Sequence, residues 1–255
     1  MRVVALIGWK DFKQIVSSPI FFLMAALNAV IWSLTFKGFL TNFAQETMRF
    51  GMTGQGGGPN IIRVVFTPHI QITNLIFIVV LPALTMRLIS EEKKLRTYDL
   101  LMTSPITAAQ IVLGKFFAGL GATTCLLAVS FLYPLGMGLI ADFNWPTVMT
   151  VYLGMFMMSA LYVASGLFAS SLTESSMLAV FMGVIFNFLI WFIGPSAAGS
   201  DIKWVSSVME YLTVGQQLMS FISGSIQVSA LIFFVTIIGF FVFLSERVIE
   251  SSRWR

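Results

Sequence analysis

The sequence has few of the residues that enzymes use for chemistry. Its 255 residues include one cysteine, Cys125, and one histidine, His69. A lone cysteine excludes an intrachain disulfide and a cysteine metal site, and a lone histidine argues against a histidine metal site or a nucleophile–base pair. The sequence also lacks the phosphate-loop pattern Gly-x-x-x-x-Gly-Lys-Ser/Thr, so the chain does not bind ATP by that device. We therefore expect no catalytic residue, no metal and no cofactor in this chain, and we interpret His69 as an interfacial residue at the head of a span.

Charge is also scarce. Only 10% of the residues are charged and 57% are hydrophobic, against roughly 25% charged residues in a typical soluble domain. The mean hydropathy is +0.90. This composition predicts an integral membrane protein, and helices are the spanning structure that satisfies its backbone within one segment. We expect an all-α polytopic protein made of one transmembrane domain, 1–255.

Apolar runs place the expected membrane spans. Six runs reach or approach the roughly 20 residues that cross the hydrocarbon core as helix. They cover 20–36, 72–86, 108–139, 146–170, 177–197 and 228–245. The third is too long for a straight crossing, so we expect it to project into the cytosol or to bend at Tyr133-Pro134. Lys115 lies near the start of this run, where we expect its ammonium group to snorkel to the interface.

The basic residues predict the orientation. With the N-terminus inside, only Lys37, Arg49, Arg63 and Lys203 of the 15 lysines and arginines fall outside, so both termini are predicted to be cytoplasmic. The net charge of +4 suits anionic lipid rather than nucleic acid. This orientation leaves two long connections on the outer side. Residues 37–71 are expected to form a flexible loop with the glycine-rich tract GMTGQGGGPN, and residues 199–227 to form short amphipathic helices.

The first 19 residues predict a helix that lies in the membrane interface. Trp9 and Phe12 recur with other apolar residues at helical spacing, and Lys10 and Lys13 lie mostly elsewhere on the wheel. Charges also interrupt the apolar region that a signal peptide would need. The segment is therefore expected to remain part of the protein.

The densest charge cluster lies between the second and third spans, in 87–107. It contains Arg87, Glu91, Glu92, Lys93, Lys94 and Arg96, followed by Thr97, Asp99 and the apolar residues Leu100, Leu101 and Met102. Pro105 ends this element and Thr107 can cap the next helix. The charges alone fit a loop that only fixes topology. The apolar cluster beside them favours a short helix that docks on another protein.

This segment resembles the permease subunits of ABC-2-type transporters, in the gliding-motility-associated and nitrous-oxide-reductase-associated branch. Members carry Arg-x-x-x-Glu-Glu-(basic)-x-x-Gly-Thr-x-(acid)-Leu-Leu-x-(Thr)-Ser-Pro after the second span, and Gly-Lys at the next one. The matching residues here are Arg87, Glu91, Glu92, Lys93, Thr97, Asp99, Leu100, Leu101, Thr103, Ser104, Pro105, Gly114 and Lys115. Two positions differ: Arg96 replaces the usual glycine and Asp99 the usual glutamate.

The resemblance implies a role for each part of the chain. Segment 87–107 is similar to the coupling helix, which seats in a groove of a separate ATP-binding subunit that holds ATP and Mg, and the N-terminal helix lies against the same subunit. A second permease, identical or different, completes the pair. Gliding-type relatives often work beside a membrane-anchored auxiliary protein with a periplasmic domain, and the resemblance implies a bacterial inner membrane.

Alternatives to this reading remain at this point. The chain could be a non-transporting membrane anchor, or a lipid-active enzyme that recruits Asp142, Asp201 and Glu210 from different loops. The small residues Gly114 and Ala118 lie on one helix face, continued by Ala122, which suits packing within one subunit or a seam between two.

Overall fold

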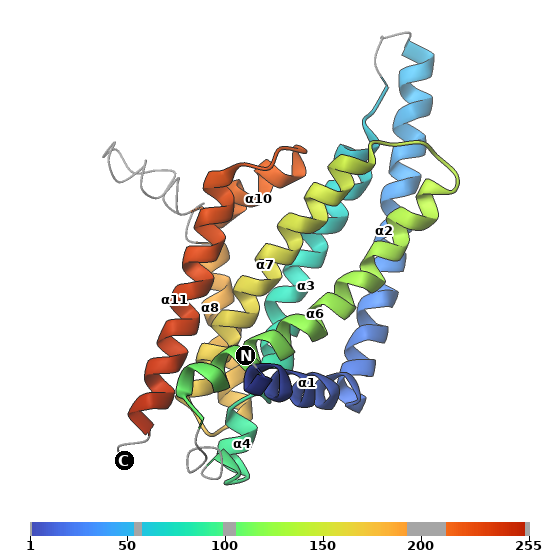
Figure 1. Ribbon diagram of the computed structural model, residues 1–255. Helices are drawn as coiled ribbons and strands as arrows, with labels where there is room; N and C mark the ends of the chain where they lie inside the picture. Colours follow the sequence, from blue (N-terminus) through green and yellow to red (C-terminus); the bar gives the residue numbers. More distant parts are fainter. Residues whose placement is uncertain (1, 54–57, 99–105, 193–212, 253–255) are drawn as a thin grey trace.

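The structure is a computed structural model that describes residues 2–53, 58–98, 106–192 and 213–252. Within these ranges the chain is helical, with no strand. Figure 1 shows long helices running side by side, with α1 lying across one end of the bundle. The helices are α1 (Arg2–Val16), α2 (Pro19–Thr53), a π-helical turn (Ile62–Phe66), α3 (Thr67–Thr85), α4 (Ser90–Lys94), α6 (Ala108–Gly138), α7 (Trp145–Leu172), α8 (Ser176–Phe192), α10 (Val214–Ile222) and α11 (Val228–Ser252).

Five helical stretches are long and apolar enough to cross a membrane. They are Pro19–Met52, Ile62–Lys94, Ala108–Gly138, Trp145–Leu172 and Val228–Ser252. The predicted fifth span corresponds to α8, which is shorter, with 17 residues, and the rest of that predicted run lies outside the described ranges. The all-helical prediction is confirmed, and the part of the chain that the structure describes supplies five of the six predicted spans at full length.

The expected outer loop 37–71 differs from the structure. Helix α2 continues 17 residues past the predicted end at Phe36 and ends at Thr53, inside the glycine-rich tract, and helix resumes at Ile62. Ala44, Gln45 and Glu46 are good helix formers, so the segment extends as helix beyond the apolar run. Most of the described part of 37–71 is therefore helical.

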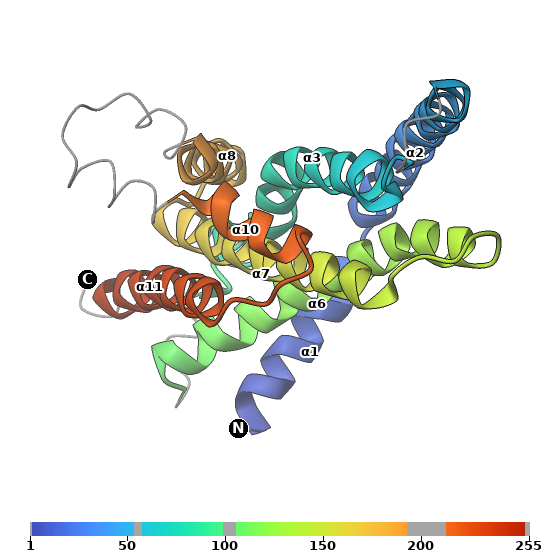
Figure 2. The same cartoon turned by 90° about the horizontal axis from the view of Figure 1, so that it is seen from above.

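Both described chain ends lie at one end of the bundle. Figure 1 places α1, α4 and the last turn of α11 together, and α10 at the opposite end. Helix α10 occupies part of the predicted connection 199–227, and the remainder up to residue 212 lies outside the description. Helix α7 packs against α3, α6, α8, α10 and α11, so it forms the centre of the bundle, as Figure 2 shows from above.

Two prolines lie inside membrane helices, and each leaves a backbone carbonyl without its helical donor. Pro82 in α3 leaves the Ile78 oxygen, to which the Asn187 side chain of α8 donates at 3.2 Å. Pro134 in α6 leaves the Ser130 oxygen, to which the Tyr152 hydroxyl of α7 donates at 3.0 Å. Because an unpaired carbonyl is costly away from water, each proline fixes a neighbouring helix beside it. Helix α6 continues through the predicted bend to Gly138.

Close approach of three helices surrounds Pro82. A Cβ on Gly183 of α8 would lie 2.8 Å from the Pro82 Cβ and 3.7 Å from the Gly166 Cα of α7. Only glycine permits this spacing. The approach brings Asn187, one turn further along α8, within reach of α3.

His69, which the sequence places at the head of a span, is fully buried within the protein. Its Nε2 lies 3.1 Å from the Ser130 hydroxyl, and its ring packs edge-on against Phe36 and Trp32. Both rings come from α2, so this helix covers the first turns of α3.

We predict that Asn187→Leu destabilises the protein by about 1–3 kcal/mol, because the Ile78 carbonyl loses the side-chain donor that α8 supplies in an apolar interior. Thermal unfolding of the purified protein in mild detergent measures this as a lower Tm. Phe188→Leu, on the neighbouring residue with 41% of its side chain exposed, is the matched control. Equal stability of the two variants would contradict this account of Pro82.

Candidate functional site

Helix α1 crosses α6 at a point where both backbones come close. A Cβ on Gly114 would lie 2.9 Å from the Ile7 Cβ and 3.1 Å from the Val4 carbonyl oxygen, and a Cβ on Gly8 would lie 3.1 Å from the Gly114 oxygen. The small residue at 114 therefore serves packing within this chain. Ala118 and Ala122, on the same face, are buried in the described core.

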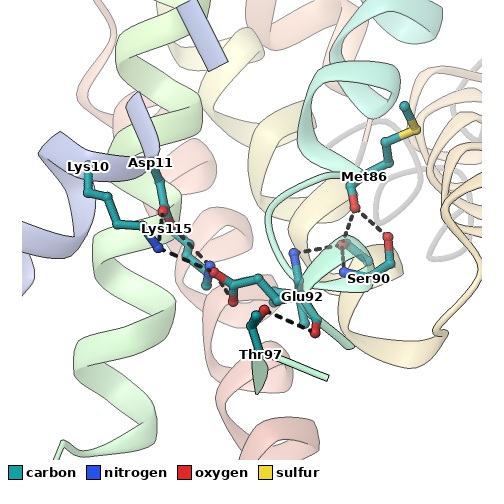
Figure 3. A network of polar contacts seen from close by, with 9 residues as sticks. Lys10, Asp11, Met86, Ser90, Glu92, Thr97 and Lys115 are labelled. Atoms are coloured by element: carbon teal, nitrogen blue, oxygen red, sulfur yellow. Dashed lines mark hydrogen bonds and ion pairs between the residues drawn. The ribbon is translucent and has the colours of Figure 1, made fainter. Parts of the chain in front are cut away.

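Lys115 follows directly and carries a buried charge. Its side chain is 1% exposed, and its Nζ lies 3.0 Å from Asp11 Oδ2 and 2.8 Å from Glu92 Oε2. The expectation that Lys115 snorkels is wrong, because two carboxylates reach it from α1 and α4. Figure 3 shows these side chains converging where the three helices meet.

Neutralisation explains why the cluster takes this form. A charge in a low-dielectric site costs several kcal/mol unless it is paired. One lysine between two carboxylates leaves an excess negative charge, and Lys10 offsets it, with its Nζ 3.7 Å from Asp11 Oδ1 and 4.0 Å from Glu92 Oε1. Asp11 is 6% exposed and Glu92 16%, whereas Lys10 is 68% exposed. We call Lys10, Asp11, Glu92 and Lys115 the charge cluster.

Helix α4 is also tied to the end of α7. The Ser170 hydroxyl of α7 accepts from the backbone N–H groups of Ile89 and Ser90 at 3.2 and 3.0 Å and donates to the Met86 oxygen at 2.9 Å. A side chain of another helix thus serves the unpaired donors at the start of α4. At the other end of α4, the Lys93 ammonium donates to the Ser171 oxygen at 2.6 Å.

Helix α4 ends in a tight turn that explains one departure from the family pattern. The Thr97 N–H donates to the Glu92 oxygen at 3.0 Å and the Arg96 N–H to the Lys93 oxygen at 3.1 Å, which together form a Schellman motif. Arg96 has φ 57°, the only non-glycine residue with a positive φ in the described ranges. Arg96 therefore occupies a left-handed position, which glycine adopts without strain.

A cavity of about 430 Å³ opens beside the charge cluster, between α1, α4 and the ends of α3 and α6. Its charged lining residues are Lys10, Asp11, Arg87, Glu91, Glu92 and Lys115. Arg87 Nε lies 3.1 Å from Glu91 Oε2. Because acids and bases balance, the cavity suits a polar group of a partner better than a free anion or cation.

The structure brings three of the predicted docking residues together at this cavity. Arg87, Glu91 and Glu92 line the cavity, and Lys93 turns toward α7. Lys94, Arg96 and Thr97 are exposed. Asp99, Leu100, Leu101, Met102 and Pro105 lie outside the described residues.

The N-terminal residues divide between two flanks of α1. Lys10 joins the charge cluster, whereas Trp9 and Phe12 lie on the opposite flank, and Lys13 is exposed. Tyr98 is buried, with the Lys93 ammonium 5.3 Å from its ring centroid.

Sequence reasoning missed Asp11 and Ser170 as site residues and misread Lys115. Two features of the sequence could have indicated the pair: Lys115 is a single lysine in a long apolar run, and Asp11 is the one acid in an otherwise basic amphipathic helix. Each charge needs a partner of opposite sign if it is buried. No group of three or more histidine, cysteine, aspartate or glutamate residues that could hold a metal occurs in the described ranges.

These features define a multi-pass membrane protein whose short charged helix at one end is locked to three neighbouring helices. The sequence matches the model of the ABC-2 family transporter proteins over residues 5–243, and the chain belongs to that family. It is a membrane transport component and not itself catalytic. Such permeases generally pair with an ABC ATP-binding subunit. A search of the curated proteins finds no match.

We predict that Lys115→Met destabilises the protein by about 3 kcal/mol, because Asp11 and Glu92 are left as unmatched charges with little solvent. The triple variant with Asp11→Asn and Glu92→Gln removes the mismatch and recovers most of the loss. Unfolding in detergent compares the two. A triple variant less stable than the single one would rule out charge pairing as the cause.

We predict that Arg96→Gly raises the free energy of unfolding by about 0.5–1 kcal/mol, since glycine relieves the left-handed backbone. Lys94→Gly, in the last turn of α4, is the control and lowers it by up to about 1 kcal/mol. The Tm shifts then have opposite signs. Shifts of the same sign would refute the role of the turn.

Proposed function

We propose that this chain is the permease of an ATP-driven ABC-2 complex, in which 87–107 docks on a separate ATP-binding subunit and carries its movement into the membrane. The observation that supports this most is the fixing of α4. Side chains from α1, α6 and α7 hold it, while Lys94, Leu95 and Arg96 remain exposed. A loop that only sets topology needs no such bracing.

The contacts suggest a division of labour among the predicted docking residues. Glu92 faces Lys115 and positions α4, and Lys93 does so through Ser171. Lys94, Arg96 and Thr97 are exposed and available to a partner, with Leu100, Leu101 and Met102 as the expected apolar anchors. Glu91 and Arg87 border the cavity and accept a polar group of the partner.

The remaining parts of the proposal follow from the family resemblance and the charge pattern. The complex contains a second permease, identical or different, and the ATP-binding subunit holds ATP and Mg. It resides in a bacterial inner membrane with both termini cytoplasmic. It acts as an exporter or as a device that transmits force, and the gliding-motility branch implies an auxiliary protein at the outer connections.

Reversal of exposed charge tests the docking surface. We predict that Lys94→Glu with Arg96→Glu lowers the amount of ATP-binding subunit that copurifies with the tagged chain by at least about tenfold, because like charges then face the partner. Glutamate at 96 keeps the same backbone requirement as arginine. Lys37→Glu, at an exposed site midway along α2, is the control. Undiminished copurification of the double variant would exclude this surface as the docking site.

The anchor alternative differs in its response to nucleotide. A fluorophore on Ser225→Cys, in a Cys125→Ser background, reports on the end of α10 far from α4. Trapping the ATP-binding subunit with a non-hydrolysable nucleotide changes its signal if movement crosses the membrane. An unchanged signal in an intact complex favours the anchor.

A further inference from the structure

Helix α1 borders an apolar groove on the flank opposite the charge cluster. The groove, of about 730 Å³, lies between Val4, Ala5, Trp9 and Phe12 of α1 and Leu113 and Phe117 of α6. Its one polar side chain, Gln110, already accepts from the Thr107 N–H in the cap of α6. The volume lies within the roughly 300–1,000 Å³ of ordinary ligand sites. Trp9 is 67% exposed and Phe117 54%, so none of the residues that the structure describes covers the groove.

The groove faces the membrane-spanning part of α6. A Cβ on Gly121, well inside that helix, would lie 3.0 Å from the Phe12 ring. Lys10, Asp11 and Gln14, on the other flank of α1, line the polar cavity. Helix α1 lies across the bundle end (Figure 1), as expected of an amphipathic helix at the boundary between hydrocarbon and headgroups.

Charge identifies the occupant. Arg2, Lys10 and Lys13 are all exposed, and the one acid of α1, Asp11, is buried against Lys115. The exposed charge of this helix is therefore entirely positive. Lys13 follows Trp9 by four residues and Arg2 precedes it by seven, so both basic side chains lie on the same side of α1 as Trp9, beside the groove and outside its lining.

We propose that this groove binds an anionic phospholipid, with an acyl chain along Phe12, Leu113 and Phe117 and the headgroup phosphate beside Lys13, while Arg2, about 16 Å away along the helix, adds to the positive charge of α1. A second copy of the chain fits less well, because a twofold contact through this flank would bring the basic side chains of the two α1 helices together. The inference needs only the membrane location of the chain. It does not depend on the ATP-binding partner.

Quenching of Trp9 fluorescence by brominated lipid tests the site. The full chain is placed in phosphatidylcholine nanodiscs with a small fraction of brominated phosphatidylglycerol, or the same fraction of brominated phosphatidylcholine. The difference between wild type and Trp9→Phe isolates Trp9. We expect the anionic lipid to quench Trp9 at least about threefold more than the zwitterionic one, since each basic residue near a headgroup adds to anionic preference.

Variants separate recognition from mere contact. Arg2→Gln with Lys13→Gln abolishes the preference and keeps the weaker quenching common to both lipids, whereas Ala5→Phe fills the groove and reduces quenching by either lipid. Lys37→Gln, which removes one charge from α2, preserves the preference. Equal quenching of wild type by the two lipids would overturn the proposal. So would disulfide cross-linking between Ala5→Cys copies in a Cys125→Ser background, which would assign the groove to a second copy.

Discussion

The pairing of the Lys115 ammonium is the constraint on which the working end of the molecule depends. A charge at this depth requires partners, and the partners come from elements distant in sequence: Asp11 is 104 positions away in α1, and Glu92 lies in α4. The glycine just before it lets α1 come close enough for Asp11 to reach. The Gly-Lys pair at 114 and 115 therefore acts together. Gly114 lets the backbone of α1 come close to α6, and Lys115 forms the ion pair with Asp11.

The same requirement organises the bundle further from this end. Helices in an apolar environment have no hydrophobic preference for one neighbour over another. Polar groups that need partners provide that preference. Pro82 and Pro134 each release a carbonyl, and Asn187 and Tyr152 each supply the donor from a different helix. Two prolines that the sequence presents as breaks in helices thus act as markers for helix neighbours.

The sequence predicted what depends on local pattern. The apolar runs predicted the helical class and the approximate helical stretches, and the amphipathic pattern of the first 19 residues predicted the helix that is found there. The pairing of Lys115 with Asp11 was not predictable in this way, because neither residue has a periodic pattern and their contact depends on how α1 crosses α6. The extension of α2 was missed because hydropathy marks the membrane boundary, whereas helix propensity decides where a helix ends. Arg96 was noticed as a departure, but only the backbone shows that its position is left-handed.

The ties on α4 also limit how it can move. Separating Glu92 from Lys115 would remove one of the two ion pairs of a buried lysine, which is costly where little water can replace it. A push on α4 is therefore more easily accommodated by movement of α1, α4 and the start of α6 together than by breaking the cluster. Because the opposite flank of α1 forms the apolar groove, such a movement would also displace whatever lies in that groove. The charge cluster and the groove are then mechanically linked through one helix, which presents Asp11 to the protein interior and Trp9 to the surroundings.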